Sequence, residues 1–86
     1  MVLYKILWKK SAEKDLKNIP HKLINRIIEV IDSLSKNPLP PRVRKITGSV
    51  NLYRLRIGDY RIIYEVNSNI KNVMIIYIRN RKDVYK

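Results

Sequence analysis

The sequence contains no cysteine and a single histidine, and its acidic residues are few, with seven Asp and Glu against 19 Lys and Arg. The absence of cysteine excludes a disulfide framework, a thiolate metal site and a thiol nucleophile. A single histidine argues against zinc sites built from several histidines and against a Ser-His-Asp triad. We therefore expect neither a metal nor another cofactor.

Long hydrophobic runs are also missing. The longest one, Val73 to Ile78, has the length of a β-strand, and no segment resembles a signal peptide or a membrane span. We expect a cytoplasmic protein that does not bind membranes. A chain of 86 residues is typical of one domain, here 1–86, with a core large enough for two layers of secondary structure.

Positive charge is what the sequence has in excess, with a formal net charge of +12. A field of this strength on so short a chain favours nucleic acid as the partner. Arginine and lysine are unevenly distributed along the chain. Seven of the eight arginines lie between Arg42 and Arg81, whereas lysines dominate residues 1–38. Arginine presents a planar, permanently charged fork that suits phosphate, so we look for chemistry in the arginine-rich half.

The segment Leu52 to Val66 predicts a β-hairpin closed by the two-residue turn Gly58-Asp59, with glycine where a type II′ turn requires it. A two-residue loop sets the register of the two strands. The predicted pairs are Ile57 with Tyr60, Arg56 with Arg61, Leu55 with Ile62, and Arg54 with Ile63.

Side chains alternate along these strands, so the hairpin has an uncharged face and an arginine face. The uncharged face carries Tyr53, Leu55, Ile57, Tyr60, Ile62 and Tyr64. The arginine face carries Arg54, Arg56 and Arg61. Two arginines directly across a ladder repel each other, which a polyanion-binding site justifies and a fold alone does not. The alternative is that these arginines only guard the strands against edge pairing.

The remaining pattern predicts an α+β fold. It comprises a small antiparallel sheet of about four strands in the order β-α-α-β-β-β, with an N-terminal helical hairpin on one face. The first strand is expected at Val2 to Trp8 and the first helix from an N-cap at Ser11 to Asn18. The second helix spans Pro20 to Ser35, with Pro20 at its first position. Its apolar stripe comprises Leu23, Ile24, Ile27, Ile28, Ile31 and Leu34.

A Pro-rich linker at 37–41 leads into the basic stretch 42–48 before the hairpin, and a polar loop at 67–72 precedes a final strand from Val73 to Arg79. Strict alternation turns Met74, Ile76 and Ile78 towards the core. The same alternation places Val73, Ile75, Tyr77, Arg79 and Arg81 on the arginine face. An exposed apolar patch of Ile63, Ile75 and Tyr77 then indicates a binding partner.

Clustered arginines beside tyrosines, without metal ligands, favour RNA cleavage without a metal ion, in which guanidinium groups stabilise charge on the attacked phosphate. Arginine does not readily deprotonate, so the candidate bases are Lys45, Tyr85 and His21. Exposed tyrosines stack on unpaired bases. The candidates are Tyr53, Tyr60, Tyr64, Tyr77 and Tyr85. Core packing is the competing interpretation for the hairpin tyrosines Tyr53, Tyr60 and Tyr64.

Two segments resemble the RelE/ParE toxin superfamily. The first is Leu-Tyr-Arg-Leu-Arg-Ile-Gly-Asp-Tyr-Arg-Ile-Ile-Tyr at 52–64, preceded by Lys-Ile-Thr-Gly at 45–48. The second is the tail Ile-Arg-Asn-Arg-Lys-Asp-Val-Tyr at 78–85. The order and length of the other elements agree, so the resemblance covers essentially the whole chain.

This resemblance implies the toxin of a type II toxin–antitoxin pair. A RelE-like toxin is a ribosome-dependent, metal-independent endonuclease, an mRNA interferase that inhibits translation by cutting mRNA in the A site. The alternative within the superfamily is a ParE-like toxin that inhibits DNA gyrase and has no nuclease activity. A basic RNA-binding module without catalysis is a third hypothesis. The implied partners are a cognate acidic, RelB-like antitoxin, in a heterotetramer or heterodimer, together with the ribosome and mRNA.

The resemblance also assigns site residues. Arg54 and Arg56 stand where bacterial RelE-like toxins have two lysines, and Arg61 matches the phosphate-stabilising arginine. Arg81 matches the arginine that assists the leaving group, and Tyr85 matches the tyrosine that stacks on the substrate base. Around this catalytic set, the expected RNA-binding residues are Arg42, Arg44, Lys45, Arg79 and Lys82. Asn80 replaces a histidine found in many members, and Lys45 is the candidate to compensate as base.

Overall fold

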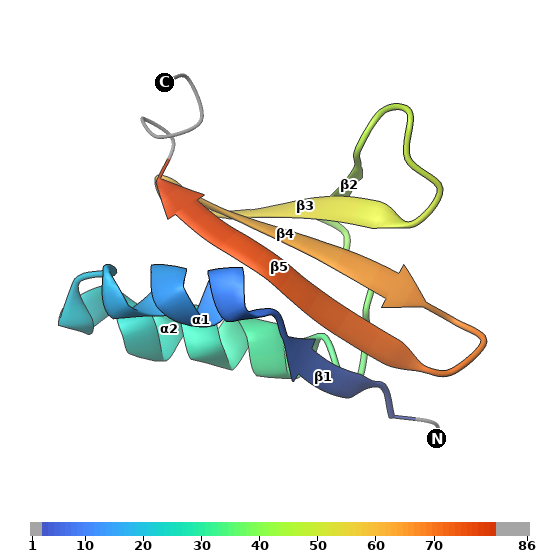
Figure 1. Cartoon of the computed structure of the whole chain (residues 1–86), viewed down its shortest axis with the longest axis horizontal. Helices are drawn as coiled ribbons and strands as arrows, with labels where there is room; N and C mark the ends of the chain where they lie inside the picture. Colours follow the sequence, from blue (N-terminus) through green and yellow to red (C-terminus); the bar gives the residue numbers. More distant parts are fainter. Residues whose placement is uncertain (1–2, 81–86) are drawn as a thin grey trace.

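The computed structural model describes residues 3–80. Two helices and five strands follow one another in this range (Figure 1). They are β1 (Lys5–Trp8), α1 (Lys10–Lys17), α2 (His21–Ser33), β2 (Arg44–Lys45), β3 (Leu52–Ile57), β4 (Tyr60–Asn67) and β5 (Asn72–Asn80). Both helices lie on the same side of the sheet, so the predicted α+β fold with a helical hairpin on one face is confirmed.

The sheet differs from the prediction in two respects. Its strand order is β1-β5-β4-β3-β2, and the short β2 adds a strand that the sequence pattern did not indicate. In addition, β1 pairs with β5 in parallel, so the sheet is mixed rather than antiparallel. After β1, the two helices carry the chain across one face of the sheet. The last strand, β5, then pairs with β1 and runs in the same direction.

The β3–β4 hairpin has the predicted register. Arg56 pairs with Arg61 and Leu55 pairs with Ile62, as the two-residue turn requires. Gly58 has a φ of 57°, the left-handed conformation that the first central residue of a type II′ turn must adopt. The alternation of the hairpin side chains is therefore settled by the turn.

The facing predicted for β5 is wrong in its first half. Ile62 pairs with Ile78 and Ile63 with Tyr77, but Tyr64 then pairs with Ile75, so Ile76 is an extra residue in β5. This β-bulge reverses the alternation on its N-terminal side. Val73 and Ile75 are consequently buried in the core, whereas Met74 is paired with Glu65 on the opposite face.

The core lies between the helices and the uncharged face of the hairpin. Tyr64, Ile62 and Ile75 are fully buried from the sheet side, and α2 contributes Ile27 and Ile31 from the predicted stripe. The Tyr64 hydroxyl donates a hydrogen bond to the carbonyl of Pro38 at 2.8 Å, which attaches the Pro-rich linker to the core. None of the helices within residues 3–80 is long and apolar enough to cross a membrane.

Helix α1 begins without the predicted side-chain cap. The N–H of Lys9 donates to the carbonyl of Ile75 at 2.9 Å, and the helix starts directly afterwards at Lys10. Ser11 therefore lies inside the helix, and its hydroxyl donates to the carbonyl of Ile76. In α2, Pro20 precedes the first helical residue, and the helix ends at Ser33 rather than Ser35.

Candidate nucleic-acid interface

The arginine face of the hairpin lies on the side of the sheet away from the helices. Arg56 and Arg61 are direct neighbours across β3 and β4, and Arg54 pairs with Ile63 on the same face. Strand β2 adds Arg44 directly across from Arg54. These side chains enclose an open hollow of about 260 Å³, which we term the cationic hollow. It is lined by Arg42, Arg44, Arg54, Arg56 and Arg61.

Four of these five arginines are not neutralised by a carboxylate of the described chain. Within residues 3–80, Arg42, Arg44, Arg54 and Arg56 form no ion pair with a carboxylate. The Nε of Arg56 donates to the carbonyl of Gly58 at 2.9 Å, so the hairpin turn itself orients this guanidinium. Four like charges held close together raise the local attraction for an anion, and guanidinium groups bind phosphate in a two-pronged geometry.

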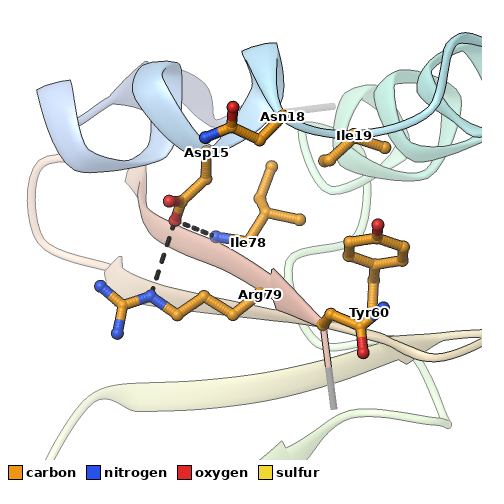
Figure 2. Close-up of a pocket in the computed structure, with 7 residues that line it drawn as sticks. Asp15, Asn18, Ile19, Tyr60, Ile78 and Arg79 are labelled. Atoms are coloured by element: carbon orange, nitrogen blue, oxygen red, sulfur yellow. Dashed lines mark hydrogen bonds and ion pairs between the residues drawn. The ribbon is translucent and has the colours of Figure 1, made fainter. Parts of the chain in front are cut away.

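Arg79 takes a different position from the five arginines of the cationic hollow. It is paired directly with Arg61 in the β4–β5 ladder, but its guanidinium lies 4.4 Å from the centre of the Tyr77 ring. Its Nε is 3.8 Å from Oδ2 of Asp15 in α1 (Figure 2). The same Asp15 oxygen accepts the backbone N–H of Ile78 at 3.0 Å. Arg79 is thus partly compensated by a carboxylate of its own chain.

Asp15 was not among the residues predicted for this site. Ser11 and Asp15 are four residues apart and therefore share one side of α1, and both bond to the edge of β5 beyond the end of β1. The four-residue spacing of these short polar side chains was visible in the sequence. The strand to which they bond could not be identified from it, because that strand lies more than 60 residues further along the chain.

A second hollow adjoins the first and is largely apolar. This apolar hollow has a volume of about 200 Å³ and is lined by Ile46, Arg54, Arg61, Ile63 and Tyr77. Arg54 and Arg61 line both hollows. The exposed apolar patch predicted from Ile63, Ile75 and Tyr77 is wrong in this form, since Ile63 is only 6% exposed and Ile75 belongs to the core.

Two candidate bases lie elsewhere. Lys45 pairs with Tyr53, so its position belongs to the helix-covered side of the sheet and not to the arginine face. His21 is an exposed residue at the start of α2. The predicted site residues Arg81, Lys82 and Tyr85 lie outside the described residues. Across residues 3–80, no group of three or more His, Cys, Asp or Glu side chains is arranged to hold a metal ion.

The hairpin tyrosines lie on the uncharged face. Tyr64 is fully buried, and its ring centre is 6.1 Å from that of the half-buried Tyr53. Burial, with a smaller contribution from Tyr53, raises the pKa of Tyr64 well above its ordinary value of 10.0. Tyr64 therefore remains a neutral hydrogen-bond donor and supports the core, whereas Tyr77 is the tyrosine that lines the apolar hollow.

Each comparison with known proteins matches a toxin or a toxin–antitoxin complex. The family described as "ParE toxin of type II toxin-antitoxin system, parDE" matches residues 6–85. Toxin RelE3 of Methanocaldococcus jannaschii is 38% identical over 85 residues, which are 94% of this chain and 94% of that protein. A chain in the archaeal RelE–RelB complex from Pyrococcus horikoshii OT3 is 34% identical, with a TM-score of 0.82 over 93% of this chain and 97% of that one.

Proposed function

We propose that this chain, which belongs to the RelE/ParE toxin superfamily of type II toxin–antitoxin systems, is a ribosome-dependent endonuclease that cuts mRNA in the A site. The observation that carries the proposal is the cationic hollow, where five arginines gather on the sheet face that the helices leave uncovered. Relatives at 38% and 34% identity carry the name RelE, which favours the nuclease branch over gyrase inhibition.

The proposed reaction is an internal transfer at one phosphate of the RNA. The ribose 2′-oxygen attacks the adjacent phosphorus and loses its proton, while the bond from phosphorus to the 5′-oxygen breaks and that oxygen gains a proton. The products are a 2′,3′-cyclic phosphate and a 5′-hydroxyl. Negative charge grows on the phosphate oxygens during attack, and the guanidinium groups of Arg54, Arg56 and Arg61, which line the same hollow, stabilise it.

The proposed regulator is an acidic, RelB-like antitoxin. The related archaeal protein from Pyrococcus horikoshii was solved in a RelE–RelB complex. A toxin with a formal net charge of +12 attracts an acidic partner at a high association rate, and an acidic segment on the cationic hollow competes with RNA. We place both the ribosome target and this antitoxin in the cytoplasm.

Primer extension on an mRNA translated with and without the protein tests the proposal. We expect breaks at codon-defined positions that appear only when ribosomes translate the mRNA. Intact mRNA together with gyrase trapped on linearised DNA contradicts the proposal and supports the gyrase inhibitor. Binding to ribosomes without any cleavage supports the non-catalytic RNA-binding module instead.

The contribution of the tail is tested separately with Arg81→Ala. Loss of cutting at unchanged ribosome affinity assigns Arg81 a role in the chemical step. Loss of affinity alone assigns it to binding, and cutting at the wild-type rate removes it from the site.

A further inference from the structure

The cationic hollow and the apolar hollow form one continuous feature, because Arg54 and Arg61 line both of them. On one side of these two arginines lie only further arginines. On the other side lie Ile46, Ile63 and the ring of Tyr77. A ligand that spans this boundary must therefore combine a strongly anionic group with an adjoining apolar one.

The Tyr77 ring is held in place before any ligand binds. The guanidinium of Arg79 lies 4.4 Å from the ring centre, a cation–π distance. Arg79 is in turn held by Asp15 in α1, whose Oδ2 also accepts the N–H of Ile78 (Figure 2). Because these contacts restrict the Tyr77 side chain, stacking on its ring costs less conformational entropy than it would on a side chain without them.

We propose that the two hollows together are a nucleotide subsite, in which the apolar hollow takes one unpaired base against Tyr77 and the cationic hollow takes its phosphate. This inference rests on the proposed function for RNA as the ligand, and it extends that function by naming where a base is bound. A volume of about 200 Å³ lies below the roughly 300–1,000 Å³ of whole-ligand pockets, which suits a single ring system.

An acidic peptide with a neighbouring apolar side chain is the competing occupant. The nucleotide is favoured because one carboxylate cannot neutralise the four guanidinium groups of the hollow that form no ion pair within residues 3–80. A polynucleotide brings a phosphate with every base. The flat ring of Tyr77 adds a preference for planar ligands, since base–aromatic stacking does not depend on which base is present.

Binding of a fluorescent, single-stranded RNA hexamer to the full chain, followed by anisotropy, tests the subsite. The hexamer carries 2′-O-methyl groups so that it cannot be cut. Tyr77→Leu keeps apolar bulk but removes the aromatic ring, and we expect it to weaken binding by roughly 5- to 100-fold. Tyr77→Phe keeps the ring and is the matched control, with wild-type binding expected.

Two further measurements separate the base from the phosphate. Removing single bases from the hexamer is expected to weaken wild-type binding at one position, and that loss is expected to vanish in Tyr77→Leu. In a salt series, Tyr77→Leu is expected to leave the slope of log K against log salt unchanged. Arg54→Gln is expected to make that slope shallower by about 0.7, the value for one phosphate contact on a single strand.

The inference is overturned if Tyr77→Leu binds the hexamer as the wild type does, or if no missing base affects wild-type binding. It is also overturned if Tyr77→Leu weakens binding of an acidic antitoxin peptide while RNA binding is unchanged. The base-removal series uses the wild-type chain, so it decides the matter even if the Leu variant does not fold. Ribosomal mRNA cleavage by the wild type is measured separately, so its absence counts against the proposed function alone.

Discussion

The two faces of the β3–β4 hairpin are built from alternate residues of the same strands, yet they have opposite properties. Leu55 and Ile62 face the helices and are almost completely buried, at 3% and 0% exposure. The chain neighbours of Leu55, Arg54 and Arg56, are exposed on the other side and line the cationic hollow. One residue along a strand is enough to change a side chain from core to interface.

This difference separates stability from binding within a very small protein. Burial of apolar side chains on the helix-covered face supplies the free energy of folding. The arginine face opposes folding, because Arg56 and Arg61 lie directly across from each other. Substitutions on the two faces are therefore expected to have separable effects, which the following four predictions test.

The largest effect is expected on the arginine face and on activity. Arg61→Gln is expected to slow single-turnover cleavage of mRNA on programmed ribosomes by about 10²- to 10³-fold, as is typical when one group that stabilises transition-state charge is removed. The matched control is Arg26→Gln, which makes the same change on the exposed side of α2 and is expected to keep the wild-type rate. Equal losses in both variants indicate that net charge matters and placement does not.

Neighbouring residues on opposite faces provide the second test, measured as the free energy of unfolding in urea. Leu55→Ala is expected to cost about 2–5 kcal/mol because it leaves a cavity in the core. Arg54→Ala, one residue away, is expected to stay within about 0.5 kcal/mol of the wild type. Comparable costs for the two variants contradict the division of labour between the faces.

A smaller effect is expected from the buried hydroxyl of Tyr64. Tyr64→Phe removes the hydrogen bond to the Pro38 carbonyl, at a cost of about 0.5–1.5 kcal/mol in the free energy of unfolding. Tyr77→Phe is the control on the other face, because the Tyr77 hydroxyl makes no hydrogen bond within residues 3–80. A Tyr64→Phe variant with the wild-type free energy of unfolding shows that the Pro-rich linker is held without the hydrogen bond from Tyr64.

The last prediction concerns the pH dependence of the stability that the Tyr64 hydroxyl contributes. Because burial raises the pKa of Tyr64 above 10.0, the unfolded chain loses this proton at a lower pH than the folded chain. The contribution of Tyr64 to the free energy of unfolding is therefore complete below pH 10. Above pH 10 it falls by at most about 1.4 kcal/mol per pH unit. We expect the difference in unfolding free energy between wild type and Tyr64→Phe to shrink between pH 9 and pH 11. An unchanged difference excludes Tyr64 as the titrating group.

Much of the candidate site was predictable because it depends on one hairpin. The register follows from the turn at Gly58, so the pairing of Arg56 with Arg61 is a consequence of local sequence. Arg42 and Arg44 were predicted to bind RNA because they belong to the basic stretch directly before the hairpin. The short β2 is what brings Arg44 across from Arg54. The assignment of the chemistry itself remains a prediction.

The apolar hollow could not be predicted in this way. Strict alternation along β5 predicted that Ile75 is exposed. The bulge at Ile76 buries Ile75 instead, and Tyr77 and Ile63 line the hollow. A bulge has no reliable signature in an apolar run such as 73–78, because every residue there is suited to either face.

The sequence alone determined the features whose causes are local: the helical stripe, the type II′ turn and the alternation that separates arginines from core residues in the hairpin. Only the tertiary structure decided which strand pairs with β1, where β5 changes face, and that Asp15 reaches Ile78 and Arg79. The β1–β5 pairing and the Asp15 contacts join residues more than 60 positions apart. Their energies exist only once the helices have packed on the sheet, so no local pattern in the chain records them.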